Sequence, residues 1–196
     1  MSVDDEKNSD LIEDCFNRFN IHIRFDENEK KLLIDQYVIY YSSKVAVIQT
    51  LDEVFLNMAY YFRTNKANPF IVDAGSEVGV VTIFFKLFYP GSKILCFEPH
   101  PCAFRLLEKN IKANKLSDTI AINAALANKD GVAEFFGECD SAEDVDTRGS
   151  SIIDTWGLQR ETSSMIQVKA VKLSEYINQD VDYLKLNVEG AEQQIL

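Results

Sequence analysis

Short apolar runs alternate with amphipathic segments from Asn68-Pro69 onward, and this alternation restricts the fold more than any other feature of the chain. We expect strands at about residues 70–74, 93–98, 119–123 and 182–187, and helices at about residues 78–88 and 101–115. Short apolar strands that are separated by amphipathic helices form parallel sheets with right-handed crossover connections. The sequence therefore predicts an α/β fold with a Rossmann-like sheet.

Residues 1–66, ahead of this alternation, are expected to form a helical extension to a domain that spans residues 67–196. Apolar residues recur at helical spacing within residues 11–19. Two further helices are expected where a capping-box pair precedes apolar residues, namely Asp26 with Glu29 and Thr50 with Glu53.

Two segments are ambiguous. Residues 44–49 fit either a helix or a short strand. The polar residues 137–164 separate two further candidate strands, residues 132–136 and 166–171. A connection of that length in a compact domain is either mobile or functional.

The charge balance restricts the partners. The chain of 196 residues carries 20 Lys and Arg against 31 Asp and Glu, a formal charge of −11. A surface this acidic repels phosphate backbones and anionic lipids, so we expect neither nucleic acid nor membrane as a partner. No apolar run approaches the roughly 20 residues that span a bilayer, and the acidic start lacks the form of a secretory signal, so a cytoplasmic location is expected.

Cysteine and histidine are too sparse for a disulfide framework or a structural metal site. The four cysteines show no paired CxxC spacing, and only two histidines are present. Reduced thiols and no bound metal are the expectation.

The segment from Ile71 to Gly79 reads as a strand that turns through glycines into a helix. Gly75 permits close backbone approach, and the helix amides after Gly79 present partial positive charge. The carboxylate of Asp73 repels a phosphate but suits an amino group, such as that of S-adenosylmethionine. The glycine spacing is GxxxG rather than the GxGxxG of dinucleotide folds, which disfavours a nicotinamide dehydrogenase.

Two further strand ends carry acidic residues. Glu98 ends the second strand about 20 residues after the glycine turn, where a carboxylate accepts ribose hydroxyls. Asn187, Glu189 and Glu192 follow the fourth strand and are expected at the carboxyl edge of the sheet, where ligands bind in open α/β folds.

Five ordered motifs make the chain resemble one family. They are DAGSEVG, FEPHP with a helix ending EKNIKANKL, NAALANKDG, VKLSEYI and LKLNVEGAE. From residue 69 to residue 196, this combination resembles the FkbM family of S-adenosylmethionine-dependent methyltransferases.

The resemblance implies a cofactor site and an acceptor. Its cofactor-binding residues would be Asp73, Gly75, Ser76, Glu77, Gly79, Glu98, Pro99, Asn123 and Ala124. His100 would lie beside the adenine, and Ser150 and Ser151 would contact the acceptor. The reaction would be O-methylation of a small molecule such as a sugar or a secondary metabolite.

Two departures from the family pattern favour an alternative, a degenerate domain that binds without turnover. Ser76-Glu77 stands where the family usually has Ala-Asn, and Asn187 stands where it usually has Asp. An amide does not accept a proton at neutral pH, so the catalytic base would be Glu189 or Glu192. The competing role for these two acids is to stabilise the N-terminus of a helix.

The methyltransferase sheet that the resemblance implies has seven strands, but only four can be placed in this sequence. We therefore expect that the C-terminal strands are missing and that the chain is a truncated form of a longer protein. Otherwise, a second copy of the chain would cover the exposed edge of the sheet.

Overall fold

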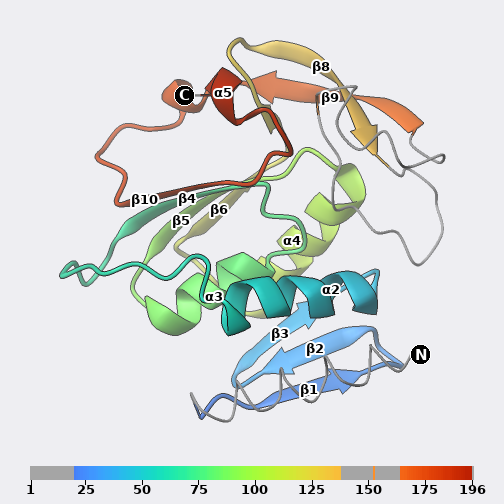
Figure 1. Ribbon diagram of the computed structural model, residues 1–196, viewed down its shortest axis with the longest axis vertical. Helices are drawn as coiled ribbons and strands as arrows, with labels where there is room; N and C mark the ends of the chain where they lie inside the picture. Colours follow the sequence, from blue (N-terminus) through green and yellow to red (C-terminus); the bar gives the residue numbers. More distant parts are fainter. Residues whose placement is uncertain (1–19, 138–151, 153–163, 196) are drawn as a thin grey trace.

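A computed structural model of the chain describes residues 20–137, 152 and 164–195, and its centre is a parallel sheet in the order β10-β4-β5-β6 (Figure 1). The strands are β4 (Phe70–Ala74), β5 (Lys93–Phe97), β6 (Thr119–Ile122) and β10 (Tyr183–Leu186). Two helices make the first connections, α3 (Val80–Phe88) and α4 (Pro101–Ala113). All six predicted elements and the Rossmann-like α/β class are confirmed.

The parallel sheet is buried on both faces, which explains its nearly continuous apolar strands. Ile71 and Cys96 belong to the core that includes α3, whereas Val72 and Phe97 belong to a second core on the opposite face. Because side chains alternate along a strand, each strand supplies both cores. Asp73 is on the same face as Ile71, next to α3.

A smaller sheet, β7-β9-β8, follows β6 along the chain. It comprises β7 (Ala125–Leu126), β8 (Gly131–Gly137) and β9 (Ser164–Val171), and the short helices that follow are η2 (Leu173–Glu175) and α5 (Glu192–Ile195). The strands expected at residues 132–136 and 166–171 are thereby confirmed.

The N-terminal segment differs from the expected helical extension. It forms an antiparallel sheet of β1 (Ile23–Asp26), β2 (Lys31–Ile34) and β3 (Tyr37–Tyr40), at the opposite end of the molecule from β8 and β9 (Figure 1). The helix expected after Asp26 is therefore wrong.

The pair Asp26 and Glu29 lies in a turn between two strands, not at the start of a helix. The Glu29 backbone N–H donates to Asp26 Oδ1 at 3.2 Å, as in a capped helix, but the chain then turns back into β2. Lys30 ends the turn with φ of 45°, and Asp35 in the next turn has φ of 48°. These left-handed residues close two hairpins, and Leu32 and Ile34 then alternate into the core.

The next helix also has different bounds from those expected. Helix α2 (Lys44–Leu51) starts after Ser43, whose Oγ accepts from the Ala46 N–H, and η1 (Asp52–Leu56) continues it as one π-helical turn. Thr50 does not cap a helix, because its hydroxyl donates to the Ala46 carbonyl oxygen inside α2. The strand alternative for residues 44–49 is excluded, and the helix expected within residues 11–19 lies outside the described residues.

Among the described residues, no helix combines the length and apolar character needed to cross a membrane.

Candidate functional site

The loop between β4 and α3 starts at Gly75, which has φ of 77°. A Cβ at this position would lie 2.0 Å from the carbonyl oxygen of Asn187, so only glycine fits against the end of β10. The Gly75 and Ser76 N–H groups both donate to the Phe97 carbonyl oxygen, at 2.9 and 3.1 Å. The glycine therefore lets three strand ends meet at one point of the sheet edge.

Gly79 has a related role at the start of α3. Its φ is 93°, and a Cβ there would lie 2.9 Å from Leu107 Cδ1 of α4. The close neighbour is therefore the adjacent helix rather than the sheet.

Asp73 lies behind this loop and is fully buried. Its Oδ1 is 3.0 Å from Lys185 Nζ, and its Oδ2 accepts from the Thr82 hydroxyl at 3.0 Å. Lys185 Nζ also donates to the Gly75 carbonyl oxygen at 2.7 Å. With these partners Asp73 supports the loop from within the protein, and its expected contact with a cofactor amino group stays a prediction.

Ser76 has a similar internal role, because its hydroxyl donates to the Asp73 carbonyl oxygen at 2.7 Å.

Glu98, just after β5, is the most distinctive group at the sheet edge. Its side chain is almost completely buried, yet it lines a cavity. Oε2 accepts from the Glu77 N–H at 2.8 Å and Oε1 from the His100 N–H at 2.7 Å. Burial raises the pKa of Glu98 to about 7, although these two hydrogen bonds oppose the shift.

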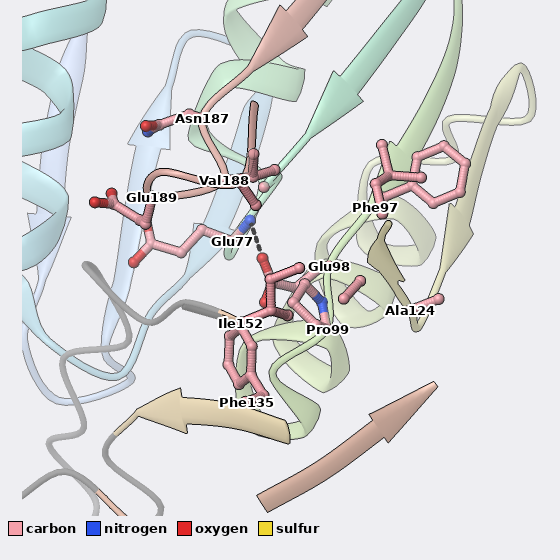
Figure 2. A pocket seen from close by; sticks show the side chains of 14 residues that line it. Glu77, Phe97, Glu98, Pro99, Ala124, Phe135, Ile152, Asn187, Val188 and Glu189 are labelled. Carbon is pink, nitrogen blue, oxygen red and sulfur yellow. Dashed lines mark hydrogen bonds between the residues drawn. The ribbon is translucent and has the colours of Figure 1, made fainter. Parts of the chain in front are cut away.

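The cavity next to Glu98, here called the first cavity, has an apolar wall. The wall comprises Phe97, Pro99, Ala124, Ala125, Leu126, Phe135 and Ile152. Figure 2 shows Pro99, Phe135 and Ile152 on the same side as Glu98. The carboxylate oxygens of Glu98 can accept hydrogen bonds from hydroxyl groups of a ligand, and the apolar wall beside them offers a surface for a flat ring.

Of the residues expected to bind the cofactor or to lie beside its adenine, Pro99 and Ala124 line the first cavity, whereas Asn123 and His100 make hydrogen bonds within the protein. The Asn123 amide donates to the carbonyl oxygens of Glu98 and Pro99 at 2.8 and 3.1 Å. His100 Nδ1 accepts from the Cys102 N–H at 3.2 Å and caps α4. Neither is among the described residues that line the first cavity.

A second cavity adjoins the first and shares a rim with it. The shared residues are Gly75, Glu77, Asn187 and Glu189. In Figure 2, the side chains of Asn187 and Glu189 are directed away from Glu98 and Phe135. The end of β10 therefore separates two neighbouring spaces and contributes to both.

The second cavity is completed by the N-terminal segment, through Thr50, Glu53, Val54 and Tyr60. The Tyr60 hydroxyl donates to Glu53 Oε1 at 2.7 Å, and burial together with this contact raises the tyrosine pKa well above its usual range. The N-terminal segment is thus part of the site rather than an appendage.

Glu192 differs from Glu189. Its Oε1 accepts from the N–H groups of Val188 and Gly190, at 3.2 and 3.3 Å, and it is not among the described residues lining either cavity. The helix-terminus role that competed with catalysis fits Glu192, whereas Glu189 remains at the rim.

Several residues of the site are absent from the sequence-based prediction. The sequence did indicate a role for Lys185, since a lysine within an apolar strand needs a buried partner. It did not indicate a role for Phe135, Ile152, Glu53 and Tyr60, because their position in the site depends on how distant segments pack. Ser150 and Ser151 lie outside the described residues. Within the part of the chain that the structure describes, no group of three or more His, Cys, Asp or Glu side chains is arranged to hold a metal ion.

Comparison with known proteins identifies relatives of this chain. Methyltransferase 1 of Beauveria bassiana (strain ARSEF 2860) is 28% identical over 184 residues, which cover 86% of this chain and 74% of that protein. Methyltransferase sdnD of Sordaria araneosa is 34% identical over 106 residues, which cover 53% of this chain and 41% of that protein. The chain thus spans less than half of the second relative.

A solved structure and a family model complete the comparison. The crystal structure of a methyltransferase FkbM from Methylobacillus flagellatus KT matches with a TM-score of 0.48 at 12% identity, covering 78% of this chain and 40% of that one. The family model described as "Methyltransferase FkbM domain" matches residues 73–196, more than half of the chain. The chain therefore belongs to the FkbM methyltransferase family.

Proposed function

We propose that the chain binds S-adenosylmethionine in the first cavity and transfers its methyl group to a hydroxyl group of a small molecule bound in the second. The observation that carries this proposal is Glu98, a buried carboxylate that faces a cavity with an apolar wall. Each Glu98 oxygen accepts one backbone N–H and keeps lone pairs for ribose hydroxyls. The carboxylate and the apolar wall of the first cavity thus fit the ribose and the adenine of the cofactor.

The position of the two cavities supports transfer between them. The cofactor supplies a methyl group that its sulfonium already activates, so the protein mainly has to align the acceptor oxygen and remove its proton. Gly75 and Asn187 form the boundary between the cavities. Glu189, on the same rim, is the carboxylate that we assign to accept the hydroxyl proton.

The charges around the second cavity favour an uncharged acceptor. Three carboxylates line it, those of Glu53, Glu77 and Glu189, whereas its lysine, Lys185, is paired with Asp73. Carboxylates repel a phosphate or a carboxylate on the acceptor and accept hydrogen bonds from hydroxyl groups. A sugar or a hydroxylated secondary metabolite fits this environment.

Asn187 supports one alternative, a domain that binds the cofactor without turnover. It lies on the rim between the cavities, and its amide does not take up a proton. The alternative holds if Glu189, the carboxylate on the same rim, does not serve as the base either.

Calorimetric titration with S-adenosylhomocysteine tests the cofactor site. We expect binding, and Glu98→Ala should weaken it about 10- to 100-fold, because charge-assisted hydrogen bonds contribute about 1.5–3 kcal/mol. Glu108→Ala is the control, since Glu108 is exposed on α4. Absence of binding to the wild-type chain would overturn the proposal.

The acceptor class is tested by measuring the transfer of a radiolabelled methyl group from S-adenosylmethionine to small molecules. Neutral polyols are compared with their phosphorylated forms. Cofactor binding without transfer to any acceptor would favour the alternative.

A further inference from the structure

Asn110 in α4 and Asn114, directly after α4, hydrogen-bond to the outer edge of β3. Asn110 Oδ1 accepts from the Tyr40 N–H at 2.7 Å, and its Nδ2 donates to the Tyr40 carbonyl oxygen at 2.9 Å. Asn114 makes the same pair of bonds to Val38, at 2.8 and 2.6 Å. The two amides thus replace a neighbouring strand along β3.

The spacing of the two elements makes this arrangement fit. Residues four apart on a helix are separated by about 6 Å along its axis. Residues two apart on a strand are separated by about 6.8 Å, and both expose their backbone groups on the same edge. A helix with asparagines at positions i and i+4 can therefore pair with alternate residues of a strand.

The two asparagines differ in their third hydrogen bond. The Asn114 amide donates to the Asn110 carbonyl oxygen at 2.8 Å, within its own helix end. The Asn110 amide donates instead to the Val78 carbonyl oxygen at 2.8 Å, in the loop between β4 and α3. Asn110 is 2% exposed, so this amide joins three backbone groups in a region that water does not reach.

Val78 directly follows Glu77, whose backbone N–H donates to Glu98 Oε2. A continuous path of contacts therefore runs from Tyr40 in the N-terminal sheet through Asn110 to the loop and to Glu98. This path connects a sheet that precedes the family match to the carboxylate that faces the first cavity.

We propose that Asn110 is a positioning residue that couples the docking of the N-terminal sheet to the conformation of the loop at Gly75–Gly79, and thereby to ligand binding at Glu98. The part of this proposal that concerns ligand binding rests on the proposed function, whereas the coupling between the N-terminal sheet and the loop does not. Asn114 is its matched control, because it makes the same contacts to β3 without reaching the loop.

The first test uses S-adenosylhomocysteine as the probe and compares Asn110→Ala with Asn114→Ala in the full chain, at a temperature where circular dichroism shows both to be folded. We expect Asn110→Ala to weaken binding about five- to tenfold, the effect of about one hydrogen bond, and Asn114→Ala to change it less than twofold. Equal losses in both variants would overturn the proposal.

The pH dependence of binding gives a readout that a merely structural role would not move. The charged side chains that act on Glu98 are Glu77, which raises its pKa, and Lys185, which lowers it, while the N–H groups of Glu77 and His100 also lower it. In Asn110→Ala, a weaker hydrogen bond from the Glu77 N–H to Glu98 should raise the pKa of Glu98 and move the midpoint of binding to higher pH. An unchanged midpoint in that variant would contradict the coupling.

A second measurement is independent of any ligand. Hydrogen exchange of peptides that cover residues 75–80 should be faster in Asn110→Ala than in the wild type, and unchanged in Asn114→Ala. This difference is expected even if the wild type fails to bind S-adenosylhomocysteine, a result that would overturn the proposed function alone. If Asn110→Ala does not fold, Asn110→Ser and Asn114→Ser provide the same comparison. Indistinguishable exchange in the two variants would refute the role of Asn110.

Discussion

Asp73 and Lys185 are register partners on the neighbouring strands β4 and β10, and Lys185 Nζ lies 3.0 Å from Asp73 Oδ1. The side chains are 0% and 2% exposed. Removing one member of such a pair leaves an uncompensated charge in the core, whereas removing both costs much less. The pair therefore stabilises the junction of the two strands only as a unit.

Lys185→Met should lower the free energy of unfolding by about 3–5 kcal/mol, measured by urea denaturation. The double variant Asp73→Asn/Lys185→Met should recover most of this loss. Lys172→Met is the control, since the exposed pair of Lys172 with Glu175 should contribute less than about 1 kcal/mol. A loss at Lys185 no larger than at Lys172 would contradict the interpretation.

Gly75→Ala should be more destabilising than Gly131→Ala. Both glycines have positive φ, which costs alanine about 1–2 kcal/mol, but only at Gly75 would the new Cβ meet an atom, the Asn187 carbonyl oxygen at 2.0 Å. We expect Gly75→Ala to exceed the control by about 2 kcal/mol or more in urea denaturation. Equal effects would show that β10 can shift without cost.

Stability should depend on pH through Glu98. Its pKa is raised from 4.5 to about 7 in the folded chain, so folding favours the protonated form. Its stabilising contribution is therefore full below pH 4.5 and is lost as the pH rises through 7, a decrease of about 3 kcal/mol. Glu98→Gln should lack this decrease when unfolding is measured from pH 5 to pH 8. Parallel profiles for the two proteins would refute the raised pKa.

Ligand binding should show the opposite dependence on pH. Ribose hydroxyls donate to the ionised carboxylate, so affinity for S-adenosylhomocysteine should fall as the pH is lowered below 7. Titrations at pH 6 and pH 8 measure the difference. No change between them would indicate that Glu98 does not contact the ligand.

Glu189→Gln and Glu192→Gln should separate catalysis from structure. Glu189→Gln removes the proposed base and should reduce turnover about 100-fold or more, with the affinity for S-adenosylhomocysteine unchanged. Glu192→Gln keeps an oxygen to accept from Val188 and Gly190, so turnover should be nearly unchanged. The reverse order of effects would assign the base to Glu192.

The sequence predicted the elements of the parallel sheet because local patterns determine them. The run from Phe70 to Val72 is apolar and leads into a glycine turn, which specifies a buried strand without knowledge of its neighbours. At Asp26 and Glu29 the pattern was compatible with two structures, since an aspartate captures the third following N–H in a helix cap and in this hairpin turn alike. The chain forms the hairpin, in which Leu32 and Ile34 of β2 pack into the core.

The site was predictable only in part, because its contacts join residues that are distant in the sequence. Glu98, Pro99 and Ala124 follow strands, and the structure brings all three to the lining of the first cavity, while their contact with a cofactor stays a prediction. Lys185 could be expected to need a buried partner, but the sequence did not indicate that this partner is Asp73. Asn110 had a signal of its own: with Ala103 and Leu107 it occupies the buried face of α4, where an amide needs specific partners.

The position of β10 in the sheet also affects how the chain folds. Lys185 reaches the carbonyl oxygen of Ala74, 111 positions earlier in the sequence, so β4 gains this neighbour only after a long loop has closed. Until then, Asp73 has no cationic partner, and the turn at Gly75 lacks the support of Asn187. Non-local pairings of this kind form slowly. The edge of the sheet at Gly75 and Asn187 should therefore be among the last parts of the molecule to become ordered during folding.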